Sequence, residues 1–456
     1  MQRSLRTLTT IVMLLLVAGL PVFAAGQGEG GGSAEEVTIS IALPNNPISQ
    51  GLADLAEEYY EAEGVTVQIS VLPENDLRSR LLTEASTGGT TYDMFVFGPY
   101  EALNWAKFGW LENLEPYFDA LSDEQLAEYD RDDLIPAMQE SLSMDGDAYA
   151  LPFYGESAFV MYNEELFEEH DLTMPEQPTW DQLYDFATTI HDEEEGTVGM
   201  TMRGAPGWGM VGAPFVPMVN AYGGRFYDMD WNATVDTPEQ RAAWQMFKKI
   251  LVDAGQEDIV SYTYNEAIAL MQSGNAGIYF DATSIAPPLE SAESEIAGNV
   301  GYALPPQGPE HVSQWLWNWA FGINPNAPQA NKEAVFDFML WATSKDYIEL
   351  SYEEDSTGAI TPPASRASTY EMEGYADVPY ADMTLETLEQ TEFDNPTVDP
   401  VPYQGLQYIA IPEFTDLGDS MTEWLAAYIV GDMTLDEAIQ RTQDAFDQAA
   451  VDGGYR

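Results

Sequence analysis

The sequence predicts an α/β protein with two lobes, each a mixed or parallel sheet flanked by helices, and a ligand cleft between the lobes. Strand and helix patterns alternate with short links between residues 37 and 108. The same alternation returns between residues 149 and 280. The chain has 456 residues, which is enough for two large lobes. Ligands of open α/β sheets bind beyond the carboxyl ends of the strands, where loops collect.

The first alternation begins with two strand patterns. Residues 37–43 and 65–71 alternate apolar side chains with small or polar ones, which is typical of strands. Between them a helix is predicted, because Ser49 can cap its start and Gly64 can end it. A helix, a strand and a third helix are predicted next, at residues 76–86, 92–97 and 100–108. Such short strand–helix–strand links require right-handed crossovers, which predicts a parallel sheet with helices on both faces.

The second alternation extends to the C-terminus. Strands are predicted at residues 149–154, 158–162 and 276–280. Residues 237–240 (Thr-Pro-Glu-Gln) form a capping box with proline at the first helical position. Helices are predicted at residues 180–190, 241–252, 264–272, 331–343, 417–430 and 435–450. Residues 351–410 are rich in Pro, Thr and Tyr and predict irregular structure.

Residues 1–24 have the composition of a secretory signal peptide. Arg3 and Arg6 precede a short apolar run, and Ala24 and Ala25 follow it. The run is about ten residues long, whereas a membrane-spanning helix needs about 20, so an uncleaved anchor is the less favoured alternative. Residues 25–35 are rich in glycine and predict a flexible tether. We therefore expect an exported protein without direct membrane insertion.

The charge of the chain limits its partners. Asp and Glu number 77 against 16 Lys and Arg, for a net charge of −61. This field repels phosphate, so we expect no nucleic-acid partner. Because the acids are spread along the chain rather than gathered in one tail, we interpret them as halophilic adaptation of an acidic surface. Cysteine is absent, which excludes disulfides, Cys-ligated zinc and thiol catalysis.

Two motifs resemble cofactor or metal sites but fail in context. Residues 207–212 fit the G-x-G-x-x-G spacing, yet they follow Ala-Pro rather than an apolar strand, so we expect no cofactor. Residues 228–239 have the acid spacing of a calcium loop, but Ala233 occupies the position that needs glycine. We prefer a turn followed by a helix cap there and expect no metal, with calcium as the alternative.

Aromatic residues in predicted loops and at strand ends indicate the ligand. Trp208, Trp315, Trp317, Tyr154 and Tyr403 are in such positions. Aromatic faces pack against the C–H faces of sugars, while Asp, Glu, Asn and Arg hydrogen-bond the hydroxyls. Tryptophan alternates along residues 315–319, so one face of that segment is all indole. These residues predict a cleft for a neutral polyhydroxyl ligand, with a purely structural core as the alternative.

A series of short motifs, in order along the chain, resembles the extracellular solute-binding proteins of family 1, the sugar-binding group of ABC importers related to maltose-binding protein. The matching residues are Tyr92, Asp93, Gly109, Leu111 and Leu114; Gly146, Tyr149, Leu151, Pro152, Tyr162, Asn163, Leu166 and Phe167; Pro178, Thr179, Trp180 and Asp181; and residues 266–276 and 358–366. The resemblance implies a two-lobed periplasmic-binding-protein fold of type II-like topology with three crossings between the lobes. We expect an N-terminal lobe from residues 36–137 and 301–346, and a C-terminal lobe from residues 138–300 and 347–456.

The resemblance also implies which residues face the ligand. Glu156 matches the family's cleft-wall carboxylate, and Tyr154 lies just before it. Other positions that the resemblance places in the cleft are Asn46, Tyr100, Glu101, Asp281, the tryptophans Trp315 and Trp317, and Arg366. With Trp208 and Tyr403 from the aromatic pattern, these residues form the expected ligand-binding set; no catalytic residue is expected.

The function that follows is a non-enzymatic, monomeric binding protein. It captures a mono- or oligosaccharide and delivers it to the permease subunits of an ABC transporter. Many relatives carry a lipid-anchoring cysteine and this chain has none, so we expect a free periplasmic protein. A secreted glycoside hydrolase, or the same fold binding a polyamine, remain the alternatives.

The charge leads to a prediction about salt. With a net charge of −61, self-repulsion in the folded state is strong at low ionic strength. It is screened as the Debye length falls to ~3 Å near 1 M salt. We expect the melting temperature, followed by scanning fluorimetry, to rise steeply with NaCl. A flat profile from low to molar salt would contradict the salt adaptation and leave the binding function untouched.

Overall fold

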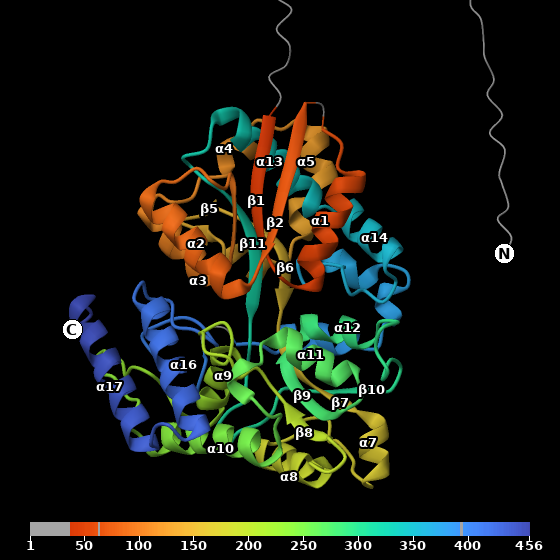
Figure 1. Ribbon diagram of the computed structural model, residues 1–456. Helices are drawn as coiled ribbons and strands as arrows, with labels where there is room; N and C mark the ends of the chain where they lie inside the picture. Colours follow the sequence, from red (N-terminus) through yellow and green to blue (C-terminus); the bar gives the residue numbers. More distant parts are fainter. Residues whose placement is uncertain (1–36, 63, 393–394) are drawn as a thin grey trace, which may run out of the picture. The chain divides into compact units, whose positions relative to one another are not determined.

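Two β-sheets organise the computed structural model, which describes residues 37–62, 64–392 and 395–456 (Figure 1). The predicted signal peptide and tether lie outside the described residues. None of the helices in the described ranges has the length and apolar composition that a membrane crossing requires.

The first sheet has five strands in the order β2-β1-β3-β11-β6. Its strands are β1 (Val37–Pro44), β2 (Val65–Leu72), β3 (Met94–Phe97), β6 (Leu151–Glu156) and β11 (Trp317–Ile323). β1 runs parallel to β2 and β3, whereas β11 is antiparallel to both β3 and β6. The sheet is therefore mixed, and its parallel half is the strand–helix–strand unit predicted from residues 37–97.

Helices flank this sheet, and together with it they form what we call the first lobe. The helices are α1 (Pro47–Tyr59), α2 (Glu74–Thr87), α3 (Pro99–Phe108), α4 (Glu115–Phe118), α5 (Asp123–Tyr129), α6 (Pro136–Glu140), α13 (Gln329–Ala342) and α14 (Lys345–Glu354). α1 begins before Ser49, because Asn46 is its cap and accepts a hydrogen bond from the Ser49 amide at 2.9 Å. A small hairpin of β4 (Ser143–Met144) and β5 (Asp147–Ala148) lies in the same part of the chain.

The second sheet has four strands in the order β10-β7-β9-β8. Its strands are β7 (Ala158–Asn163), β8 (Val198–Thr201), β9 (Ala276–Ala282) and β10 (Val300–Ala303). β8 and β9 are parallel, and β7 is antiparallel to β9 and β10. With its helices this sheet forms the second lobe. They are α7 (Glu164–Glu169), α8 (Trp180–Ile190), α9 (Gly212–Ala221), α10 (Pro238–Ala254), α11 (Tyr264–Gln272), α12 (Ala286–Leu289), α15 (Ala381–Glu389), α16 (Phe414–Val430) and α17 (Leu435–Asp452).

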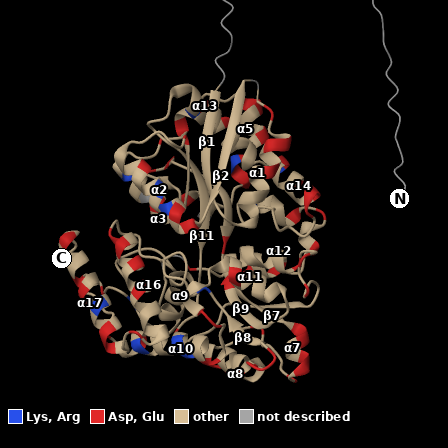
Figure 2. Ribbon diagram, in the orientation of Figure 1, with Lys and Arg blue, Asp and Glu red and all other residues tan. Residues whose placement is uncertain are grey.

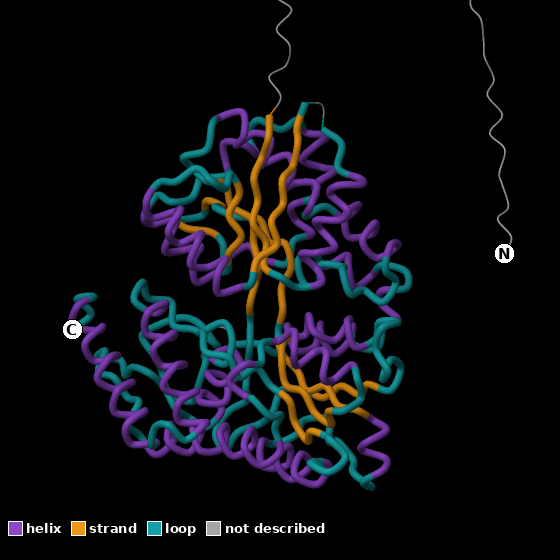
Figure 3. Tube along the Cα trace, in the orientation of Figure 1, coloured by secondary structure: helices purple, strands orange, loops and turns teal. Residues whose placement is uncertain are grey.

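The strands cross between the lobes at places that differ from the expected boundaries. β6 belongs to the first sheet and β7 to the second, so the chain crosses at Ser157 rather than near residue 137 (Figure 3). The return crossing falls between β10 and β11. α14 packs on α13, so the third crossing comes after Glu354 rather than near residue 346. A buried strand such as β6 fits either sheet by composition, and only its pairing with β11, far along the chain, decides between them.

The segment predicted to be irregular, residues 351–410, contains the end of α14 and all of α15. Arg366, which was expected to face the ligand, is fully buried in this segment. Its Nε donates to the Thr343 carbonyl at 2.7 Å, and its Nη2 donates to the Tyr129 carbonyl at 2.8 Å. Its Nη1 donates to the Asp130 carbonyl and to Asp133 Oδ2, at 3.0 and 3.1 Å. Arg366 therefore joins three segments of the first lobe and does not reach a ligand site.

This network predicts a structural role for Arg366. Replacing it with alanine removes the donor to three carbonyls, whereas Asp133 keeps its bonds to Ser368 and its ion pair with Lys345. Buried carbonyls left without a donor cost about 1–3 kcal/mol each, so the loss of stability should be about 3–5 kcal/mol. We expect Arg366→Ala to lower the melting temperature strongly, while refolded protein keeps its ligand affinity within a factor of about two. The matched control is Arg241→Ala, whose ion pairs with Asp236 and Asp436 are largely exposed, so the change should be small. A stable Arg366→Ala variant with weakened binding would contradict this assignment.

Candidate functional site

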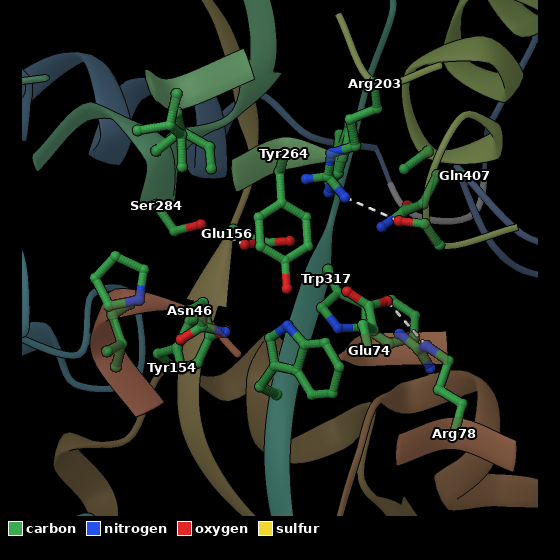
Figure 4. Close-up of a pocket in the computed structure, with 18 of the residues that line it drawn as sticks. Asn46, Glu74, Arg78, Tyr154, Glu156, Arg203, Tyr264, Ser284, Trp317 and Gln407 are labelled. Atoms are coloured by element: carbon green, nitrogen blue, oxygen red, sulfur yellow. Dashed lines mark hydrogen bonds and ion pairs between the residues drawn. The ribbon is translucent and has the colours of Figure 1, made fainter. Parts of the chain in front are cut away.

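A cavity lies between the two lobes, where the loops of both sheets meet (Figure 4). It encloses about 610 Å³ of space between atoms, its open mouth included. The first lobe contributes the β1–α1 loop, α2 and the ends of β6 and β11. The second lobe contributes the loop after β8 and the residues of α9, α11 and the turn after β9.

The pairing of β11 with β6 places four of the lining side chains. Trp317 lies opposite Glu156, and Trp319 lies opposite Tyr154. Residues directly opposite in an antiparallel pair point to the same face of the sheet, so all four reach the cavity. The register shifts after Trp319, and the next pair is Ala320 with Pro152, so a β-bulge ends the cavity-facing part of the two strands.

Arg78 of α2 is held between acids and indole rings. Its Nε is 2.9 Å from Glu74 Oε1, and its Nη1 is 2.6 Å from Glu101 Oε1. Its guanidinium carbon lies 4.3 Å from the ring centroid of Trp208, and 5.0 and 4.9 Å from those of Trp317 and Trp319. Two ion pairs and three stacked rings fix the guanidinium plane before any ligand arrives.

A second arginine, Arg203, follows β8 and is fixed in the same manner. Its Nε and Nη2 form a bidentate pair with Asp281 at 2.8 and 2.5 Å, and its Nη1 donates to the Gly209 carbonyl at 2.8 Å. Its guanidinium carbon lies 5.2 Å from the Trp315 ring centroid and 5.0 Å from that of Tyr264. Asp281 is fully buried behind Arg203, so it orients the arginine rather than lining the cavity.

Glu156 is an acid at the cavity wall that forms no ion pair with any described Lys or Arg. It is 6 % exposed, and its Oε2 accepts a hydrogen bond from Ser284 Oγ at 2.5 Å. Ser284 is its only hydrogen-bond partner among the described residues. Burial raises the pKa of Glu156 to about 7, although the charge of Arg203 acts in the opposite direction. The carboxyl group can therefore accept a hydrogen bond or, when protonated, donate one.

Several neutral groups complete the polar lining. The indole Nε1 atoms of Trp315 and Trp317 are buried and have no hydrogen-bond partner among the described residues. Asn46 Nδ2 donates to the Tyr154 hydroxyl at 2.8 Å. The Tyr264 hydroxyl donates to the Asn45 carbonyl of the other lobe at 3.0 Å. The cavity therefore offers fixed donors, acceptors and indole faces side by side.

The structure sorts the residues that the sequence predicted. Asn46, Tyr154, Glu156, Trp208, Trp315 and Trp317 line the cavity. Glu101 and Asp281 are placed behind it and hold the two arginines. The predictions for Arg366 and Tyr403 are wrong in position: Tyr403 is buried in the second lobe, where its hydroxyl accepts from the Phe226 amide at 3.2 Å. Tyr100 does not line the cavity either, and its hydroxyl contacts Thr415 instead.

Sequence reasoning missed other lining residues, namely Glu74, Arg78, Arg203, Tyr264, Ser284 and Gln407. One signal could have found Arg203. Only 16 residues of the chain are Lys or Arg, and Arg203 directly follows the largely apolar residues 198–202. A rare basic residue beside apolar segments is a candidate for a buried, paired position.

The possible calcium loop at residues 228–239 forms a turn. Asp228 Oδ1 accepts from the amides of Asp230 and Asn232 at 2.9 and 3.0 Å. The side chain of Thr237 caps α10 by accepting from the Gln240 amide, but the reciprocal bond of the predicted capping box is not made, because Gln240 Nε2 donates to the Arg225 carbonyl. Among the described residues, no group of three or more His, Asp or Glu side chains could hold a metal ion.

Comparisons with known proteins were made for the whole chain. The family model described as bacterial extracellular solute-binding protein matches residues 45–349. The mannitol-binding protein of Pseudomonas aeruginosa is 34% identical over 440 residues, covering 96% of each chain. A solute-binding protein of Agrobacterium vitis S4, solved with bound D-mannitol, is 36% identical with a TM-score of 0.87, covering 91% of this chain and 99% of its own. A ribitol complex from Agrobacterium radiobacter K84, at 21% identity and a TM-score of 0.80 over 91% and 99%, shares the fold.

The raised pKa of Glu156 predicts that this carboxylate has opposite effects on ligand affinity and on the stability of the unliganded protein. Its pKa rises from an ordinary 4.5 to about 7 on folding. The folded protein therefore binds the proton more tightly than the unfolded chain, and stability falls as pH rises from about 4.5 to 7. Removing this carboxylate should recover on the order of 3 kcal/mol above pH 7.

We therefore expect Glu156→Gln to raise the melting temperature of the unliganded protein at pH 8 and to flatten its decline between pH 5 and 7. Ligand affinity should nevertheless fall about ten- to hundredfold, because a charged acceptor is lost. Glu115→Gln is a control of opposite sign. Arg131 lowers the pKa of Glu115, so its carboxylate stabilises the fold above its ordinary pKa. A Glu156→Gln variant that loses stability at pH 8 would show that the carboxylate is structural.

Proposed function

Because the chain belongs to the family of bacterial extracellular solute-binding proteins, we propose that it binds a linear polyol of the mannitol class between its lobes and delivers it to the permease of an ABC importer. The family model and the mannitol-binding relative confirm the family that the sequence predicted. The solved structure of a solute-binding protein confirms the α/β periplasmic-binding-protein fold. The family consists of binding proteins rather than enzymes, which decides against the glycoside hydrolase alternative. The full-length likeness to a mannitol-binding protein supports the choice of ligand class.

The observation that carries the proposal is the charge arrangement around the cavity. Each arginine is already paired, Arg78 with Glu74 and Glu101 and Arg203 with Asp281. Glu156 forms no ion pair among the described residues. A carboxylate or phosphate on the ligand would meet this uncompensated acid, so the charges disfavour an anionic ligand. An ammonium group could pair with Glu156, and the case against it rests on the hydrogen-bond donors of the cavity.

The remaining groups suit hydroxyls. A hydroxyl both donates and accepts, so it can donate to Glu156 while accepting from an arginine N–H. The unpartnered Nε1 atoms of Trp315 and Trp317 can donate to further hydroxyls, which relieves the cost of about 1–3 kcal/mol for each buried unmade bond. The C–H backbone of a polyol can pack on the indole faces. The polyamine alternative leaves these donors without acceptors.

The surroundings of the protein are part of the proposal. We infer a monomer that is exported to the periplasm without a lipid anchor. Acidic side chains are distributed over helices of both lobes, and basic ones are sparse (Figure 2). Such a surface suits a saline environment, where salt screens the repulsion. Closure of the lobes on the ligand, through the crossings at Ser157, between β10 and β11, and after Glu354, is the motion that we infer for capture.

Titration calorimetry in molar NaCl tests the ligand class. We expect saturable binding of mannitol with one site, at least hundredfold weaker binding of the aldonic acid of the same length, and no heat with spermidine. The comparison with the aldonic acid measures the effect of a negative charge on affinity, because the two ligands differ only in a carboxylate at one end. Preference for spermidine, or equal binding of the acid, would overturn the proposal.

A further inference from the structure

Tyr100 is a first-lobe side chain that contacts the second lobe without lining the ligand cavity. It stands near the start of α3, and α3 faces α16 in Figure 1. Its hydroxyl is 3.0 Å from Thr415 Oγ1 and donates to the Pro412 carbonyl at 3.2 Å. It also accepts from the Thr415 amide at 3.2 Å. Burial raises the pKa of Tyr100 above its ordinary value, so the hydroxyl stays protonated and can donate.

The amide of Thr415 belongs to the first turn of α16. The first amides of a helix lack intrahelical partners and usually bond to a capping side chain. The N-cap residue of α16, Glu413, makes no such side-chain hydrogen bond. Tyr100 therefore supplies, from the other lobe, a capping bond that α16 does not make for itself.

The Tyr100 ring adds an apolar contact to the same joint. Its centroid lies 5.3 Å from that of Trp208, in edge-to-face geometry, and 5.9 Å from those of Tyr408 and Phe414. Tyr100 itself is 4 % exposed. Trp208 lines the ligand cavity, and its amide donates to Asp419 of α16 at 3.2 Å. Tyr100 and Trp208 also line a second, neighbouring cavity, and of these two residues Trp208 alone borders the ligand cavity.

We propose that Tyr100 is a clasp: a positioning residue that sets ligand affinity by stabilising the closed arrangement of the lobes, without touching the ligand. This inference rests on the proposed function only in that the ligand binds between the lobes. The apparent dissociation constant of a ligand that needs the closed form is its intrinsic value divided by the closed fraction. A change at Tyr100 therefore alters the affinity for every ligand by the same factor and leaves selectivity unchanged.

The test removes only the hydroxyl. Tyr100→Phe keeps the ring contacts and loses the bonds to Thr415 and Pro412. We expect the Kd for mannitol to rise about three- to tenfold, the usual effect of one lost hydrogen-bonding group, with faster dissociation. The ratio of the Kd values for mannitol and ribitol should not change. The control is Tyr302→Phe, whose hydroxyl bonds Glu290 Oε1 at 2.8 Å within the second lobe, and it should leave the Kd unchanged.

A second measurement needs no ligand. In the unliganded protein we expect Tyr100→Phe to speed hydrogen exchange at the first turn of α16 and to increase the radius of gyration from small-angle scattering, relative to Tyr302→Phe. If the wild-type protein binds no polyol, the proposed function is wrong. The exchange and scattering measurements on the unliganded protein still test whether Tyr100 holds the lobes together. Unchanged exchange and radius would overturn the clasp, as would a Kd ratio that shifts between polyols, since that shift would mean direct ligand contact.

A double-mutant cycle with Thr415→Val completes the test. Tyr100 and Thr415 contact each other, so their effects on the mannitol Kd should be less than additive. Strict additivity of the two substitutions would overturn the proposed contact between the lobes.

Discussion

The antiparallel pairing of β11 with β6 is the interaction on which the site depends. It joins residues more than 150 positions apart and completes the first sheet next to the point where the chain crosses to the second. Its register sets Trp317 opposite Glu156 and Trp319 opposite Tyr154, so that indoles, a phenol and a carboxyl group share one face. A slip of β11 by one residue would turn Trp317 and Trp319 toward the other face of the sheet, away from Glu156 and Tyr154. The bulge after Trp319 limits the cavity-facing stretch and returns the strand to core packing, where Phe321 stacks on Phe153 at 4.5 Å.

Around that face, the arginine side chains are already neutralised by ion pairs within the protein before a ligand binds. A chain of net charge −61 contains few cations, yet a buried arginine, Arg203, and a partly buried one, Arg78, border the cavity. Each is fixed by carboxylates from its own lobe, by Glu74 and Glu101 for Arg78 and by Asp281 for Arg203. These pairs orient N–H donors and remove net charge at the same time. Glu156 is the exception, because its burial without a cation destabilises the ionised form. A residue that costs stability in the empty protein is typical of a binding site.

Much of the fold and part of the site could be predicted from residue patterns. The alternation in residues 37–97 leads to the parallel strands β1, β2 and β3, and the capping box at Thr237 leads to α10. The cavity residues that were predicted, such as Glu156 and Trp317, lie at strand ends, where local pattern and family motif agree. Arg78 escaped prediction, because its helix face looks like any amphipathic face until Trp208 of the other lobe covers it. Arg366 was misplaced for the converse reason: its motif is recognisable, but the carbonyls that surround it come from two distant segments, at residues 129–130 and at Thr343.

The sequence by itself therefore determined many of the local elements, the acidic composition, the absence of thiol chemistry and the family, since each depends on composition or on neighbours a few residues apart. It did not predict the strands β8, β10 and β11. The tertiary structure decided which sheet β6 joins, where the lobes cross, and which of the aromatic and charged residues meet in the cavity. It also decided that Tyr100 reaches α16 instead of a ligand. The physical reason is that these outcomes are set by strand register and by packing between distant segments, and no single segment carries the information about the partner that will bury it.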